Sequence, residues 1–227
     1  MDKIEVSKEK WVKVARAVGD KNPIHYLEDG AICPGVYLLS DAEKRAREDG
    51  KFKLPINIKA NFMSWVYDGD LLFLDKNYSE EKAVLTYLKD LEKIAEFEFH
   101  KLEDSINDKY EFAGYVEYTG EIFQEDLDSF NKSLEIKNNK KLYSSFALGK
   151  VLEKFLIGRD GSLLSCLEFN FYKEPILGDL SIKLDIQKEC RKRGRKEITD
   201  YVIKGEAIQF SERIAIGFGR AQHKIIK

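Results

Sequence analysis

The chain has 227 residues, of which 34% are charged, and its formal net charge at pH 7 is −2. This balance gives no electrostatic reason to expect nucleic acid or another polyanion as a partner. Apolar runs are short, and the first residues contain no apolar stretch as long as that of a signal peptide. We therefore expect a cytoplasmic protein with no membrane span. The three cysteines, Cys33, Cys166 and Cys190, are scattered without Cys-x-x-Cys spacing, which favours neither a zinc site nor a disulfide framework.

The first predicted helix follows Ser7, a suitable N-cap, and ends at Gly19. Its apolar residues recur with the spacing of one helix face: Trp11, Val14, Ala15 and Val18. This pattern indicates a helix with a single buried stripe. Its C-terminal end leads directly into the most informative segment of the chain.

That segment places an acid and an imidazole on either side of a proline. Asp20 precedes and His25 follows Pro23, which fixes its own φ and biases Asn22 toward an extended conformation. Such a stiff turn can direct a carboxylate and an imidazole at one water molecule, so that one group takes a proton and the other returns one. Judged by residue type alone, the same residues also fit an Asn-Pro turn without a chemical role.

A second predicted helix begins at Pro34 and runs to about Glu48, with Gly50 as its C-terminal stop. Its first half is apolar and its second half is charged, so we expect a buried beginning and an exposed end. Beyond it, alternating patterns predict antiparallel strands at 56–65, 71–78, 83–88, 94–100 and 110–118. Helices followed by an antiparallel meander form an α+β unit.

The second half of the chain repeats the first with a shift of 109 positions. Asn61-Phe62, six residues and Gly69-Asp70-Leu71 recur as Asn170-Phe171, six residues and Gly178-Asp179-Leu180. The shift predicts a second apolar helix around Leu148, closed by Gly158, after a linking helix within 121–141. Further strands are predicted at 183–189, 198–203, 206–210 and 213–218. We therefore expect two repeats, residues 1–120 and 121–227.

The two predicted repeats differ in their chemical groups. Under the shift Asp20 falls on Ser129 and His25 falls on Leu134. The second repeat thus has neither the carboxylate nor the imidazole, so we expect chemistry only in the first repeat, with the second binding or bracing.

The segment from Gly19 to Ala31 resembles the hydratase motif of the MaoC-like family, the (R)-specific enoyl-thioester hydratases and 3-hydroxyacyl dehydratases. The motif has the order Gly-Asp-x-Asn-Pro-aliphatic-His, then five residues and a small residue. It is matched by Gly19, Asp20, Asn22, Pro23, Ile24, His25 and Ala31. The resemblance implies a double hot-dog fold, in which two repeats form one curved sheet around two buried central helices. A single chain would then imitate the homodimer of single hot-dog relatives, and a homodimer of whole chains stays open.

The resemblance also implies roles for individual residues. Asp20 and His25 would share the acid and base roles, without an assignment of which does which. Asn22 matches an asparagine that sets the geometry around the water, although an Asx-type turn before proline also explains it. Gly35 matches a glycine whose backbone N–H stabilises the oxyanion, or it is a glycine needed only for packing. Ser40 matches a serine that bonds the aspartate in some relatives; a serine that bonds its own i−4 carbonyl is the alternative.

The expected activity is that of a hydro-lyase, which adds water to a 2-enoyl thioester or removes it from a 3-hydroxyacyl thioester. The acyl group would be carried by coenzyme A or by an acyl carrier protein, and we expect neither a metal nor another cofactor. One alternative is a thioesterase in which Asp20 activates water against the carbonyl. Another is a non-catalytic acyl-thioester-binding protein, because only nine residues separate His25 from Gly35, fewer than in typical members.

Three other features have two interpretations each. Cys33 is either a buried inert thiol or a nucleophile. The basic run at 191–196 is a solvated turn, or it contacts the phosphates of coenzyme A or an acidic carrier protein. Glu96, Glu98 and His100 share one strand face, which is either exposed to solvent or able to hold a metal.

Overall fold

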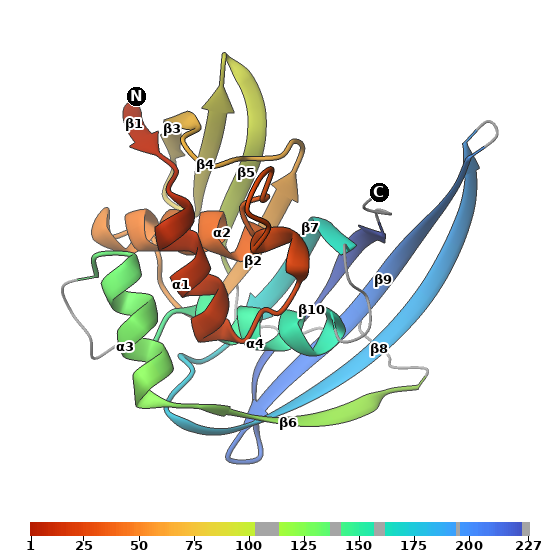
Figure 1. Cartoon of the computed structure of the whole chain (residues 1–227). Helices are drawn as coiled ribbons and strands as arrows, with labels where there is room; N and C mark the ends of the chain where they lie inside the picture. The colour runs from red at the N-terminus through yellow and green to blue at the C-terminus, as the bar shows by residue number, and fades with distance from the viewer. Residues whose placement is uncertain (103–113, 137–141, 157–161, 194–195, 224–227) are drawn as a thin grey trace.

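The computed structural model describes residues 1–102, 114–136, 142–156, 162–193 and 196–223 (Figure 1). In these ranges the strands are β1 (Asp2–Glu5), β2 (Ile56–Phe62), β3 (Leu71–Tyr78), β4 (Lys82–Lys89), β5 (Glu92–Lys101), β6 (Val116–Ile122), β7 (Ser162–Phe171), β8 (Gly178–Arg193), β9 (Lys196–Gln209) and β10 (Glu212–His223). The α-helices are α1 (Lys8–Val18), α2 (Gly35–Glu48), α3 (Gln124–Ser133) and α4 (Ser144–Leu156). None of the described helices is long and apolar enough to cross a membrane.

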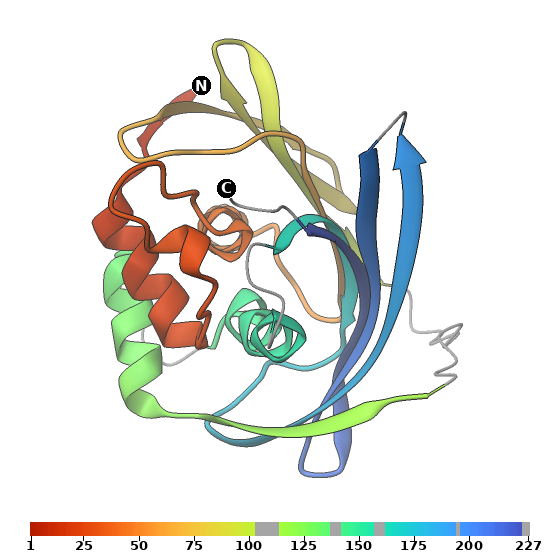
Figure 2. The ribbon, with the colours of Figure 1, turned by 45° about the vertical axis from the view of Figure 1, so that its right-hand side comes forward.

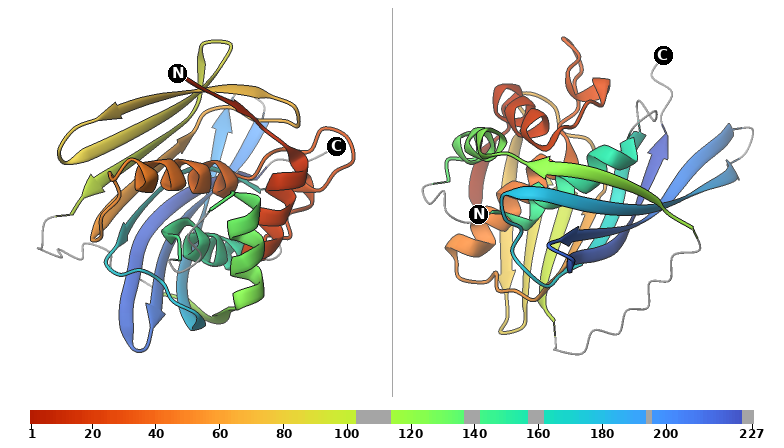
Figure 3. Two further views of the ribbon diagram at one scale, coloured as in Figure 1. Left: turned by 90° about the vertical axis from the view of Figure 1, so that its left-hand side faces the viewer. Right: turned by 90° about the horizontal axis from the view of Figure 1, so that it is seen from below.

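The described strands form a single sheet in which all neighbours are antiparallel, in the order β1-β3-β4-β5-β2-β7-β10-β9-β8-β6. Figure 2 shows this sheet curving around α2 and α4, with α1 and α3 lying beyond them. The left view of Figure 3 shows α2 crossing the concave face of the sheet. The expected α+β architecture, one curved sheet around two buried helices, is confirmed.

The two halves of the sheet meet at β2 and β7 with a reciprocal register. Asn57 faces Asn170, which is the counterpart of Asn61 under the repeat shift, and Lys59 faces Glu168, its own counterpart. This is the register of two copies related by a two-fold axis. Lys59 Nζ lies 3.3 Å from Glu168 Oε1. In a dimer of identical chains this position would face itself, so a homodimer could not place opposite charges here.

The helices agree closely with the sequence predictions. α1 follows Ser7 and ends at Gly19, whose φ of 83° is left-handed and therefore suits glycine. α2 begins at Gly35 directly after Pro34. The predicted linking helix is α3, and the second apolar helix is α4. The predicted stop at Gly158 lies outside the described residues.

The strands differ from the predictions in several places, and β7 (Ser162–Phe171), which lies in the middle of the sheet, was not predicted as a strand. β1 was not predicted, because four residues are too few for an alternating pattern. The two strands predicted at 198–203 and 206–210 are one strand, β9. Gly205 does not break it: a Cβ there would lie 3.3 Å from Phe169 and from Val151, so this glycine makes room for the core. The strand predicted at 110–118 lies partly outside the described residues, and β6 continues past 120 to pair with β8, so the boundary between repeats stays a prediction.

A buried carboxylate joins α2 of the first repeat to α4 of the second. Glu43 is fully buried, and its two oxygens accept the N–H groups of Ser144 at 2.9 Å and Ser145 at 2.7 Å. Arg47 Nη2 lies 2.8 Å from Glu43, and Arg47 Nη1 lies 3.1 Å from Glu174. A negative charge is favourable at a helix N-terminus. This contact therefore fixes where α4 begins relative to α2.

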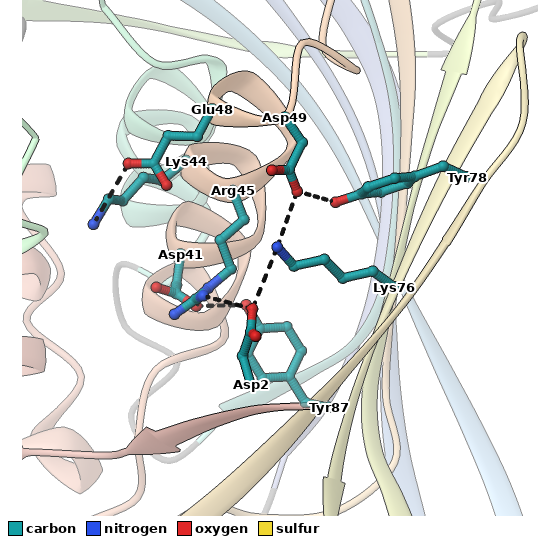
Figure 4. Close-up of polar contacts among 9 residues, drawn as sticks. All are labelled: Asp2, Asp41, Lys44, Arg45, Glu48, Asp49, Lys76, Tyr78 and Tyr87. Carbon is teal, nitrogen blue, oxygen red and sulfur yellow. Dashed lines mark hydrogen bonds and ion pairs between the residues drawn. The ribbon is translucent and has the colours of Figure 1, made fainter.

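A second polar cluster holds α2 against strands β1, β3 and β4 of the sheet (Figure 4). The hydroxyl of the buried Tyr87 in β4 donates to Asp41 at 2.7 Å. Lys76 in β3 lies 3.3 Å from Asp2 of β1 and 2.9 Å from Asp49 at the end of α2. The edge strand and the central helix are thus held to the same part of the sheet.

We expect Glu43→Gln to lower the free energy of unfolding by about 2 kcal/mol, because Arg47 and the α4 N–H groups lose a charged partner. Urea unfolding measures this loss. The control is Glu48→Gln, whose exposed carboxylate lies 3.9 Å from Lys44 Nζ, a pair that should be worth about 0.5 kcal/mol or less. Equal losses in the two variants would contradict the role given to Glu43.

Candidate active site

The turn after α1 fixes the position of the candidate acid. The backbone N–H of Asp20 donates to Ala15 at 2.8 Å, so the residue is held at the end of the helix. The N–H of Asn22 donates to Asp20 Oδ1 at 2.9 Å, and the side chain of Asn22 accepts the N–H of Ile24 at 3.4 Å. This side-chain contact opens a 3₁₀ turn at Pro23–His25. Asn22 therefore shapes the turn in the way that an Asx-type cap does.

Asp20 and His25 meet inside the protein. His25 Nε2 lies 3.5 Å from Asp20 Oδ2, and the two residues are only 5% and 7% exposed. His25 Nδ1 lies 2.6 Å from the carbonyl oxygen of Ile32. A carbonyl only accepts, so Nδ1 carries the proton, and in neutral His25 the lone pair is on Nε2, toward Asp20. The indole N–H of Trp11 donates to the carbonyl of His25 at 3.2 Å, which further fixes the turn.

The surroundings of Asp20 favour its protonated form. Burial raises the pKa of Asp20 above its ordinary value, while His25 and the N–H of Asn22 act in the opposite direction. Glu153 of α4 adds to the increase in this pKa. A carboxyl group with a raised pKa keeps its proton to higher pH than an exposed carboxyl group does, which suits a group that must donate a proton as well as accept one.

A cavity of about 440 Å³ lies beside the pair. Both repeats line it, with Gly35, Phe62 and Trp65 from the first and Leu152, Glu153 and Leu164 from the second among its walls. Trp65 and Met63 line the cavity and are 39% and 50% exposed, so it reaches the surface. A mostly apolar cavity of this size with a few convergent polar groups is typical of a small-molecule site.

Gly35 begins α2 at the wall of this cavity. A Cβ at this position would lie 2.8 Å from the ring of Phe62, so the packing alternative is supported: no side chain fits here without movement of that ring. The first N–H groups of a helix have no intrahelical acceptor. The same glycine therefore satisfies a packing need and places a backbone donor at the cavity.

For Ser40 and Cys33, the structure shows the contacts expected of the alternative without a chemical role. The hydroxyl of Ser40 donates to the carbonyl of Val36 at 2.7 Å, which is the i−4 bond of a buried helical serine, rather than to Asp20. Cys33 lines the cavity but is buried, and burial raises the pKa of its thiol well above the ordinary value. A thiol that stays protonated is a poor nucleophile.

No protein-family model and no curated protein matches the sequence. Solved structures do match. A MaoC-like dehydratase is similar with a TM-score of 0.69 at 12% identity, covering 99% of this chain and 97% of that one. A putative oleoyl thioesterase from Lactobacillus plantarum has a TM-score of 0.61 at 6% identity, with 98% and 95% covered. A protein of unknown function with a hot-dog fold from Alicyclobacillus acidocaldarius has a TM-score of 0.51 at 11% identity, with 86% and 88% covered.

The chain has a double hot-dog fold. Within this fold the second repeat lacks the pair of chemical groups that the first contains. Ser129, the counterpart of Asp20, is an exposed residue within α3, and Leu134, the counterpart of His25, is at the end of that helix.

Sequence reasoning missed Glu153, because its helix belongs to the repeat without the motif. The Cγ of Glu153 lies 3.3 Å from the position of a Cβ on Gly19, next to Asp20. Its carboxylate pairs with Lys154 at 2.9 Å. The signal that could have found it is the double hot-dog fold itself, since the two central helices pack together and one face of α4, carrying Gly149, Leu152 and Glu153, lines the cavity of the first repeat.

Other features singled out in the sequence are not among the described residues that line this cavity. His100 Nε2 lies 2.7 Å from Glu98 on the solvent face of β5, and no metal-binding cluster of His, Cys, Asp or Glu occurs among the described residues. The basic run is at the end of the long β8–β9 hairpin (Figure 3), where 194–195 lie outside the described residues.

We expect Asp20→Asn to stabilise the protein at neutral pH by roughly 1 kcal/mol, because the replacement relieves a buried charge. The pKa of Asp20 is higher in the folded state than in the unfolded state, so the wild-type carboxyl lowers the stability as the pH rises from the unfolded-state pKa to the folded-state pKa, and the full loss is present above both. The asparagine amide can still accept from Asn22 and donate to His25. Unfolding free energies measured against pH should converge at low pH, where both side chains are neutral. A variant that is less stable than the wild type at pH 7 would contradict this.

Proposed function

We propose that this protein is a MaoC-like hydro-lyase that adds water to a 2-enoyl thioester or removes it from a 3-hydroxyacyl thioester. The observation that carries the proposal is the convergence of Asp20 and His25, 3.5 Å apart, at the wall of an apolar cavity that reaches the surface. The hydratase motif in the sequence and the double hot-dog fold support it. Neither alone would assign an activity, because one fold serves many functions.

The proposed reaction needs one proton taken and one returned. Water attacks C3 of the enoyl group and gives up a proton to a base, while an acid supplies a proton to C2. One proton shared between Asp20 and His25 meets both needs. If Asp20 holds it, neutral His25 accepts from water through Nε2 and Asp20 protonates C2; if His25 holds it, the roles are exchanged. The hydrogen bond from His25 Nδ1–H to Ile32 keeps Nε2 directed at the site in either case.

The thioester carbonyl also needs stabilisation, because negative charge develops on its oxygen when water attacks C3. We assign this role to the backbone N–H of Gly35 at the N-terminus of α2, where a helix favours negative charge. The apolar walls of the cavity suit a hydrocarbon chain. The exposed Met63 and Trp65 mark where the carrier, coenzyme A or an acyl carrier protein, would enter.

A thioesterase is the second candidate, because a putative oleoyl thioesterase shares the fold. In that reaction Asp20 would direct water at the carbonyl carbon and the thiol would leave. A non-catalytic binder is the third, since the segment between His25 and Gly35 is short. Incubation with crotonyl-coenzyme A separates these outcomes: a hydratase removes the enoyl absorbance without releasing free thiol, a thioesterase releases thiol, and a binder does neither.

We expect Asp20→Asn and His25→Ala each to lower kcat/KM for crotonyl-coenzyme A by about 100-fold or more, the usual contribution of a positioned acid or base. Loss of enoyl absorbance is the measurement, and thermal unfolding checks that both variants fold. The matched control is Ser129→Ala, at the exposed counterpart of Asp20 in the second repeat, which should leave kcat/KM unchanged. Full activity in either dyad variant would refute the proposal.

The pH profile of kcat/KM should respond to Glu153. Its negative charge contributes to the raised pKa of Asp20, so Glu153→Gln is expected to lower that pKa and to move the limb that reports ionisation of Asp20 to lower pH. Glu125→Gln, an exposed acid at the start of α3, serves as the control and should leave the profile in place. A shift to higher pH in Glu153→Gln would contradict this electrostatic role.

A further inference from the structure

The two central helices begin with equivalent pairs of N–H groups that have different partners. α2 begins with Gly35 and Val36, and α4 begins with Ser144 and Ser145, which are their counterparts under the repeat shift. The α4 pair donates to both carboxylate oxygens of Glu43, at 2.9 and 2.7 Å. For the α2 pair, the hydrogen bonds among the described residues include no acceptor.

The difference is explained by one position on each helix. Glu43 is the ninth residue of α2, and the ninth residue of α4 is its counterpart, Leu152. Leu152 lines the cavity together with Gly35 and Val36, and a leucine has no atom that accepts a hydrogen bond. The partner of Glu43 is changed in the same way, because the counterpart of Arg47 is Leu156. The ion pair of one helix is thus a pair of leucines in the other.

We propose that Glu43 closes, in the second repeat, the carbonyl position that Leu152 leaves open in the first. The carboxylate of Glu43 stands where the thioester oxygen would stand if the second repeat bound an acyl group. This inference rests on the proposed function, since it takes the α2 N–H pair as the carbonyl-binding group. In this proposal Leu152 is the specificity-determining residue, because its apolar side chain leaves the N–H groups of Gly35 and Val36 available to the substrate.

Two observations support the proposal. First, the equivalent donors of α4 hold two oxygens of one anionic group, so this pair of N–H groups has the geometry to bind negative charge. Second, the open pair lines the same cavity as Asp20 and His25, whereas Glu43 is fully buried. In this proposal two changes prevent the second repeat from acting on a substrate: the acid–base pair is missing, and the N–H groups at the start of α4 are bound to Glu43.

A graded series at position 152 tests this inference. Leu152→Met keeps an apolar side chain, Leu152→Gln adds a neutral acceptor, and Leu152→Glu recreates the carboxylate that closes α4. Relative to Leu152→Met, we expect kcat/KM for crotonyl-coenzyme A to fall by about 10-fold for Leu152→Gln and by about 100-fold or more for Leu152→Glu, the scale of losing an oxyanion donor. Thermal unfolding of each variant checks that it folds.

A structural readout separates this inference from the proposed function. In Leu152→Glu, a crystal structure should show the new carboxylate accepting from the N–H groups of Gly35 and Val36, and the amide proton resonances of both residues should move downfield relative to Leu152→Met. If the Glu variant does not fold, the comparison of Gln with Met decides. Amide resonances that are the same in Gln and Met, or a Glu variant as active as Met, would overturn the inference. A wild-type protein without turnover would refute the proposed function, while the amide resonances would still decide the inference.

Discussion

The site depends on the contact between the Glu43 carboxylate and the first two N–H groups of α4. This contact links the repeats at their centre, where Glu43, Ser144 and Ser145 are all fully buried, and Arg47 balances the charge of the carboxylate. Because it sets where α4 begins relative to α2, it also sets where Gly149, Leu152 and Glu153 face the first repeat. The cavity beside Asp20 and His25 is therefore a consequence of how the two central helices are joined.

Duplication within one chain allows the two repeats to diverge at positions that a homodimer must keep identical. At the two-fold position of the sheet, Lys59 faces Glu168 rather than another lysine. On the central helices, a buried glutamate on one side corresponds to Leu152 on the other. In the proposed function the chemistry follows the same pattern, with acid and imidazole in one repeat only. Each difference uses the freedom that a covalent link between copies provides.

Local signals predicted much of this molecule. The apolar stripe of α1, its stop at Gly19 and the start of α2 after Pro34 are determined by nearby residues, and so is the turn that brings Asp20 to His25. The features that were missed depend on residues far apart in the chain. Gly205 is required by Phe169 and Val151 rather than by a turn, and the place of Glu153 beside Asp20 follows from packing between repeats. No periodicity within one segment contains that information.

The central claim is that one acyl thioester binds per chain, in the first repeat, with its reactive carbons beside Asp20 and His25. The most direct test is a crystal structure of the Asp20→Asn variant with crotonyl-coenzyme A bound. The account predicts one acyl group per chain, its carbonyl oxygen within hydrogen-bonding distance of the N–H of Gly35, and C3 next to a water molecule that contacts His25. An acyl group bound away from His25, or at the start of α4, would contradict it.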